Sequence, residues 1–225
     1  SNDEALISAI EQTQDEYEED EEVRELAVRI LAAFKTKNSV ESLSQVAIYD
    51  LSSSLRSKAI TILTEFDHES VFETILLGCA DPTREVRAAS ARGLTRLSFD
   101  RADAWTRIIE TNEEGKIRQA ARAAIEGGFV ERSFERLIHR DSKYAYEAFV
   151  LLSLIVKSGE VESLIEAIKN NQDQRVSSAI LHVFKTSRDA NSLSVLYSLI
   201  ENNNLPDNLK TEIDKTITEM TLVAA

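Results

Sequence analysis

The sequence has little of the residues that interrupt helices. Its 225 residues include six glycines, two prolines and one cysteine. With so few turn-forming residues we expect helices joined by short connections. Cys79 has no partner for an intrachain disulfide, which favours a reducing compartment. No apolar run reaches the roughly 18 residues of a membrane span. We therefore expect a cytoplasmic chain without membrane insertion.

Several absences also count against catalysis. The sequence has no glycine-rich phosphate loop, no His-Glu-x-x-His, no paired cysteines and no Gly-x-Ser-x-Gly. His68, His139 and His182 stand at unrelated positions, so a shared metal site is not indicated. We therefore predict a chain that is not an enzyme and that uses no cofactor or metal.

The chain begins with Ser1-Asn2 and has no initiator methionine. Such a pair is typical of the residues that a protease leaves behind when it removes a tag. We therefore expect the whole chain to be a segment of a longer protein, from which an anchor or signal can have been removed.

One stretch, residues 81–97, is repeated along the chain. Its residues Val86, Ser90 and Leu94 stand four and eight positions apart, as on one face of a helix. The same spacing recurs, less regularly towards the end, at six further starts: Val23, Leu55, Ile117, Tyr144, Arg175 and Leu209. Successive starts are 32, 31, 31, 27, 31 and 34 residues apart. A fixed period of this length with two helices per copy predicts an α-solenoid.

The expected fold is therefore all-α, a right-handed α-solenoid of about seven helix pairs in a single domain over residues 1–225. The expected copies are 3–35, 39–67, 69–98, 101–128, 130–157, 160–187 and 190–220. We expect Asp81 to cap a helix and Pro82 to be its first residue. Gly127-Gly128, with the short spacing of 27, predicts a left-handed turn and a kink between the fourth and fifth copies.

Two polar positions accompany the apolar pattern. A short acceptor lies five residues before most starts, and an arginine follows each of the first four. A carboxylate and a guanidinium in adjacent turns can bond from one copy to the next. We therefore predict a structural ladder from Asp50, Asp81, Asn112, Arg56, Arg87 and Arg118.

The Asp-x-x-x-x-Val-Arg pattern of Asp81, Val86 and Arg87 resembles the HEAT-repeat family, including the short bacterial repeats of phycobilisome-lyase-type proteins. The resemblance covers essentially the whole chain and is clearest in the first four copies. It implies second helices that line a concave face and bind a partner peptide or helix. It also implies two alternatives: a phycobilin lyase-like protein that handles a bilin chromophore and, less in keeping with the sequence, an alkylpurine DNA glycosylase-like protein.

Charge is distributed unevenly along the chain. The net charge is −13, which disfavours nucleic acid because phosphates attract lysine and arginine. Residues 84–140 nevertheless hold 12 basic and 9 acidic residues. We therefore expect a monomer that binds an acidic protein partner through a band of Arg92, Arg96, Arg122, Arg132 and Arg136.

The first part of the chain has the opposite sign. Residues 1–50 hold 13 acidic and 4 basic residues, with an acidic run from Asp15 to Glu25. We interpret this run as a solvated loop and helix start, with docking of a basic partner or a weak calcium site as alternatives. The spacing of an EF-hand loop is absent.

Overall fold

The computed structural model describes residues 2–14, 20–66, 68, 70–97, 101–170, 173–187, 189, 191–201 and 205–224. Helices contain most of these residues, and no strand occurs among them. The chain divides into two compact units, Ser1–Asp100 and Arg101–Ala225. Among the described helices, none combines the length and apolarity that a membrane span requires.

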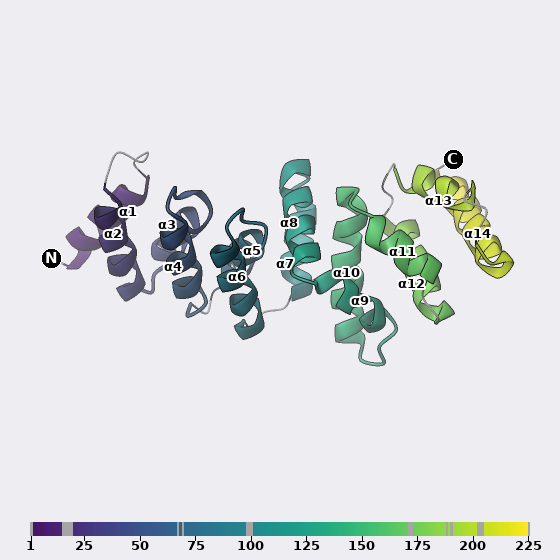
Figure 1. Ribbon diagram of the computed structural model, residues 1–225, viewed down its shortest axis with the longest axis horizontal. Coiled ribbons are helices and arrows are strands. Elements are labelled where there is room, and N and C mark those ends of the chain that lie inside the picture. The colour runs from purple at the N-terminus through teal and green to yellow at the C-terminus, as the bar shows by residue number, and fades with distance from the viewer. Residues whose placement is uncertain are drawn as a thin grey trace. The chain divides into compact units, whose positions relative to one another are not determined.

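The first unit consists of three helix pairs in two layers. The pairs are α1 (Asn2–Gln14) with α2 (Glu21–Ala33), α3 (Lys37–Tyr49) with α4 (Ser53–Leu63), and α5 (Ser70–Gly78) with α6 (Arg84–Arg96). The first helices α1, α3 and α5 pack on one another in order, and so do the second helices α2, α4 and α6 (Figure 1). This is the two-layer packing of an α-solenoid.

The second layer of this unit is packed through small residues. Ala27, Ala59 and Ser90 occupy equivalent positions and are all buried. Gly93 permits a close approach, because a Cβ atom there would lie 2.7 Å from Cγ2 of Thr64, the residue that follows α4. Gly93 thus lets α6 lie close to the end of α4, and Ser90 of α6 lies against Gly78 of α5.

The second unit contains four helix pairs: α7 (Arg101–Glu110) with α8 (Glu114–Glu126), α9 (Phe129–Leu137) with α10 (Ser142–Ser158), α11 (Glu162–Asn170) with α12 (Gln174–Ser187), and α13 (Ser192–Glu201) with α14 (Asp207–Ala224). The longer helix α10 is central, since it packs against α7, α8, α9 and α12. Trp105, Leu152 and Phe184 are fully buried in this unit.

A short turn joins α8 to α9. Gly128 adopts a left-handed conformation with φ of +68°, so the predicted left-handed turn is confirmed. In this unit, α10 packs against the second helices α8 and α12 and also against the first helix α7, and α9 packs against α8, α11 and α12. The kink between the fourth and fifth copies stays a prediction.

The helix bounds agree closely with the repeat pattern, and the all-α solenoid fold is confirmed. The single domain over residues 1–225 stays a prediction.

The expected start of α6 is wrong, because α6 begins at Arg84 and its N-cap is Thr83. Asp81 instead accepts a hydrogen bond from the backbone N–H of Thr83 (2.7 Å), so Asp81 and Pro82 form a turn that precedes the helix.

Candidate partner-binding surface

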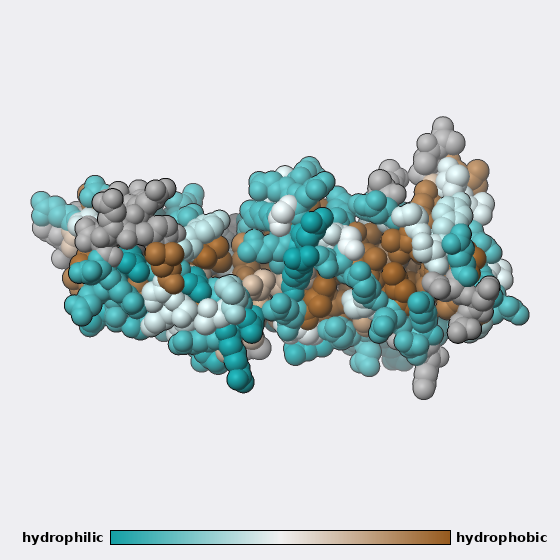
Figure 2. All heavy atoms as spheres, turned by 45° about the horizontal axis from the view of Figure 1, so that its top comes forward, coloured by the Kyte–Doolittle hydropathy of each residue, from teal (hydrophilic) through white to brown (hydrophobic). Residues whose placement is uncertain are grey.

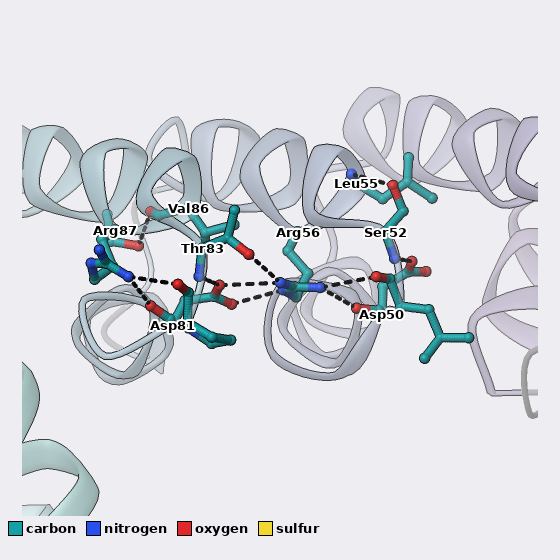
Figure 3. Close-up of polar contacts among 11 residues, drawn as sticks. Asp50, Ser52, Leu55, Arg56, Asp81, Thr83, Val86 and Arg87 are labelled. Carbon is teal, nitrogen blue, oxygen red and sulfur yellow. Dashed lines mark hydrogen bonds and ion pairs between the residues drawn. The ribbon is translucent and has the colours of Figure 1, made fainter.

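Arginine–aspartate pairs connect consecutive copies in the first unit. Arg24 of α2 donates from Nε and Nη2 to the two carboxylate oxygens of Asp50, at 2.9 and 3.3 Å. Arg56 of α4 donates in the same way to Asp81, at 2.7 and 3.1 Å (Figure 3). Helices α2 and α4 thus each bond through two parallel hydrogen bonds to the turn of the next copy.

Arg56 makes further hydrogen bonds in the same place. Its Nη1 donates to the carbonyl oxygens of Asp50 and Leu51, at 2.7 and 3.2 Å, and its Nη2 donates to Oγ1 of Thr83 at 3.1 Å. Figure 3 shows the guanidinium of Arg56 between Asp50 and Asp81. Arg56 thus donates hydrogen bonds to the turns of two consecutive copies. Its structural role in the ladder stays a prediction.

The pKa values of this pair follow from these contacts. Burial of the Asp81 carboxyl acts to raise its pKa, but the hydrogen bonds from Arg56 and Thr83 and the charge of Arg56 outweigh burial, and the pKa is lowered. The pKa of Arg56 is raised, chiefly by its hydrogen bond to Asp81. Both groups are therefore held in their charged forms.

The other predicted members of the ladder are placed differently. Arg87 donates from Nη1 to the carbonyl oxygens of Asp81 and Pro82 within its own copy, at 2.7 and 2.8 Å. Asn112 and Arg118 are exposed in the second unit, and in the described part of the chain neither side chain forms a hydrogen bond or an ion pair. Asn112 has a positive φ of 54°, so the backbone of its turn differs from that expected for a repeated turn.

The five arginines of the predicted band fall into two groups. Arg92 and Arg96 lie one helical turn apart on the exposed side of α6, in the first unit. Arg122 on α8 and Arg132 and Arg136 on α9 belong to the second unit. The Nε atom of Arg122 lies 2.9 Å from Oε1 of Glu160, so its charge is already matched.

Arg136 lies in a group of polar and aromatic side chains where α7, α9 and α10 meet. Its guanidinium carbon is 5.6 Å from the ring centre of Tyr144, and its Nη1 is 3.6 Å from Oε1 of Glu147. Nη1 of Arg101 is 3.3 Å from the same oxygen. The His139 ring lies at right angles to the Tyr144 ring, with the centres 5.3 Å apart. We call these five residues the Tyr144 cluster.

The Tyr144 cluster combines positive charge with an exposed aromatic ring. The guanidinium groups of Arg101 and Arg136 share the carboxylate of Glu147. The side chain of Arg136 is 40% exposed and Tyr144 is 44% exposed. Arg132, one turn before Arg136 on α9, is also exposed and lies 5.9 Å from the centre of the Phe129 ring. Arginine and tyrosine are the residue types that dominate the energetics of protein interfaces.

The sequence pattern names Arg136 for the predicted band and none of the other four residues of the Tyr144 cluster as a binding residue. Tyr144 enters it only as the start of a repeat, and Arg101 is distant in sequence from Glu147. The contact between Arg136 and Tyr144 depends on the α9–α10 turn, and the contact of Arg101 depends on packing of α10 against α7. Among the described residues, no group of three or more His, Cys, Asp or Glu side chains is arranged to bind a metal ion.

The sequence matches no protein-family model. No curated protein sequence resembles it significantly. Among solved structures, the chain is similar to YibA of E. coli, with 19% identity over 97% of this chain and 82% of that one and a TM-score of 0.36. An engineered protein shares 16% identity over 96% of this chain and 97% of that one, with a TM-score of 0.32. An archaeal HEAT-like repeats protein from Thermococcus onnurineus shares 11% identity over 100% of this chain and 98% of that one, with a TM-score of 0.31.

Proposed function

We propose that the chain is a non-catalytic scaffold that binds another protein, and that Arg132 and the Tyr144 cluster receive an acidic segment of that partner. The observation that carries this proposal is the placement of Arg136, which lies beside the exposed Tyr144 ring and shares Glu147 with Arg101. The function agrees with the all-helical, solenoid-like packing, which creates long helical surfaces.

Arg136 is held ready to bind a carboxylate. Its guanidinium is positioned by the ring of Tyr144 and by Glu147, so little side-chain entropy is lost when a partner binds. Because Arg101 already offers Glu147 a closer contact than Arg136 does, the remaining donors of Arg136 can serve a second carboxylate. The exposed ring of Tyr144 offers apolar contact to the side chain next to that carboxylate.

The other arginines have separate parts in the proposal. Arg132 extends the basic edge of α9 by one turn and supplies a second cation for an acidic segment that runs along the helix. Arg122 contributes less, since Glu160 already pairs with it. In the first unit, Arg92 and Arg96 form an exposed basic pair on α6, which we propose as a separate contact for acidic side chains.

The test measures binding of labelled peptides by fluorescence polarisation. The peptides present glutamate or aspartate beside leucine or phenylalanine, and a matched set carries lysine in place of each acid. We expect the acidic peptides to bind and Arg136→Glu to weaken them by about tenfold or more. The control is Arg107→Glu, which changes charge equally at an arginine of the same unit that is 49% exposed and lies outside the Tyr144 cluster.

Circular dichroism should show unchanged helicity in both variants. Equal binding by Arg136→Glu and the wild type would contradict the proposed site, as would equal binding of the lysine peptides. A mixing experiment with a free bilin tests the phycobilin alternative, because a protein that handles the chromophore shifts its visible absorbance. A shift of that kind would replace the scaffold by a chromophore-handling function.

A further inference from the structure

The turn between α3 and α4 carries two large side chains at the surface of the first unit. Tyr49 is the last residue of α3 and is 63% exposed, and Leu51 lies in the turn and is 71% exposed. Asp50, between them, is buried because its carboxylate binds Arg24 of α2. Figure 2 shows hydrophobic side chains that reach the surface of the first unit among hydrophilic ones. Tyr49 and Leu51 therefore project into solvent on either side of a carboxylate that is directed into the stack.

Hydrogen bonds fix the backbone of this turn. The carboxylate of Asp50 accepts the backbone N–H of Ser52 at 2.8 Å. Nη1 of Arg56 donates to the carbonyl oxygens of Asp50 and Leu51. A binding partner therefore meets Leu51 on backbone that is already ordered, so little conformational entropy is lost when the complex forms.

The corresponding turn of the next copy has the same pattern of hydrogen bonds around Asp81. Its carboxylate accepts the backbone N–H two residues later, and the arginine of the following helix donates to two carbonyl oxygens of the turn. In that turn Ala80 and Pro82 take the places of Tyr49 and Leu51. The turn thus forms with a small residue and a proline beside the aspartate. The fold therefore does not explain why large, exposed side chains occupy these two positions in the second copy.

Acidic side chains lie beside the same turn. Oε1 of Glu21, in the first turn of α2, accepts a hydrogen bond at 2.7 Å from Oγ of Ser52, the residue after Leu51. Asp20 is the N-cap residue of α2, and its carboxylate makes no capping hydrogen bond. Both acidic side chains are exposed, and within the described part of the chain no cation forms an ion pair with either of them. Two carboxylates that can still accept a cation therefore lie next to an exposed apolar side chain.

We propose that this surface binds a short segment of another protein in which arginine or lysine lies next to leucine or phenylalanine. We call the surface the Leu51 turn and define it by Asp20, Glu21, Tyr49 and Leu51. The cation of the segment pairs with the two carboxylates, and its apolar side chain covers Leu51. The exposed ring of Tyr49 suits both parts, because an aromatic ring attracts a cation and also packs against apolar groups. The Leu51 turn contains none of the arginines of the proposed function and takes a partner of the opposite charge.

Charge distinguishes this occupant from two others. An anionic membrane surface attracts lysine and arginine, and it repels the carboxylates of Asp20 and Glu21. A second copy of the chain carries a net charge of −13, which opposes association between copies. A basic segment is attracted by the same two carboxylates, and Leu51 selects a segment that also has an apolar side chain.

The experiment uses the whole chain and a labelled peptide that presents arginine beside leucine and phenylalanine. A second version carries glutamate in place of each arginine, and a third carries serine in place of each leucine and phenylalanine. We expect the first peptide to bind the wild type in fluorescence polarisation and the other two to bind about tenfold or more weakly. Failure of the first peptide to bind would contradict the proposal.

The turn of the next copy supplies the test variant. Tyr49→Ala together with Leu51→Pro gives the Leu51 turn the residues of that copy. The double variant should weaken binding of the arginine peptide by about tenfold or more, because both large side chains are removed. Circular dichroism and the midpoint of urea unfolding should stay as in the wild type. If the midpoint falls, Leu51→Ser replaces the double variant, with a smaller loss of binding expected.

Two matched controls separate this surface from exposed residues in general. Leu222→Ser makes the same change as Leu51→Ser at a leucine that is 74% exposed on α14, and it should bind the peptide as the wild type does. Glu21→Gln keeps an acceptor for Ser52 and removes the charge, so it should weaken binding. Its control is Glu41→Gln, which removes the same charge at a side chain that is 63% exposed on α3.

Equal binding by the Leu51 and Leu222 variants would overturn the proposal. Cosedimentation of the wild type with phosphatidylserine vesicles that Leu51→Ser abolishes would also overturn it, because the occupant would then be a lipid surface. A wild-type dimer in analytical ultracentrifugation that Leu51→Ser dissociates would do the same, since a second copy would then occupy the turn.

Discussion

Asp81→Ala tests whether the arginine–aspartate contacts hold consecutive copies together. The substitution removes both oxygens that accept from Arg56, one of which also accepts the backbone N–H of Thr83. The two charged side chains are 11% and 7% exposed, so the guanidinium left behind is largely shielded from water. We expect the first unit to lose stability while its helices remain formed.

The size of the expected loss of stability follows from how deeply the Arg56–Asp81 pair is buried. Breaking a fully buried ion pair from one side costs about 3–5 kcal/mol, and an exposed pair contributes about 0–1 kcal/mol. Arg56 keeps its hydrogen bonds to two carbonyl oxygens and to Thr83, which places the expected loss at about 2–3 kcal/mol in the free energy of unfolding. Asp141→Ala is the matched control, because the Asp141 carboxylate accepts the backbone N–H of Lys143 in a similar turn. Its expected cost is about 1 kcal/mol.

The assay is urea unfolding followed by circular dichroism, with hydrogen exchange of α4 and α6 to locate the change. The pKa of Asp81 is lowered in the folded chain from its ordinary value of 3.8. The ionised carboxylate therefore stabilises the fold at pH values above 3.8, and this stabilisation is lost as the pH falls through the pKa of the folded chain. The difference in the free energy of unfolding between the wild type and Asp81→Asn should therefore stay constant from about pH 7 to pH 5 and shrink below about pH 4.

Equal losses for Asp81→Ala and Asp141→Ala would refute this reasoning, since the ion pair would then contribute nothing beyond the turn. A double-mutant cycle with Arg56→Met gives an independent check. If the two side chains are coupled, the free energy of unfolding should fall by less in the double variant than the sum of the falls in the two single variants.

Three further predictions concern glycines. Gly93→Ala should lower the free energy of unfolding by about 1–3 kcal/mol, because its Cβ would lie 2.7 Å from Cγ2 of Thr64. Gly115→Ala, where a Cβ meets nothing within 4 Å, should instead raise it by up to about 1 kcal/mol in the same urea titration. Gly128→Ala should lower the free energy of unfolding by about 1–2 kcal/mol, because Gly128 has a positive φ. The fluorescence of Trp105, in the same unit, follows this unfolding. An unchanged midpoint of the urea transition would contradict the prediction.

Much of the fold could be predicted because it is encoded by spacing within single helices. Val86, Ser90 and Leu94 lie on one side of α6 whatever surrounds the helix, and their recurrence gave the number of helix pairs. The start of α6 could not be obtained in this way. Asp81 is equally suited to cap a helix or to accept from Arg56, and the pairing of two copies decides between them.

The candidate sites were less predictable for the same reason. Asn112 and Arg118 fit the repeat in sequence, yet the left-handed backbone of Asn112 separates this turn from the pattern of Asp50 and Asp81. Glu147 acquires its two arginines only because α10 packs against α7 after the turn at Gly128. Contacts that depend on which helices become neighbours have no periodic signal in the sequence.

The arginines of the proposed binding surface are placed differently from those that join the copies of the first unit. Arg24 and Arg56 are matched by Asp50 and Asp81 of the next turn. In the second unit, Arg136 instead lies beside the exposed ring of Tyr144 and shares Glu147 with Arg101, because α10 packs against both α7 and α9. The positions that depart from the repeat are therefore the ones to substitute first in a search for the partner site.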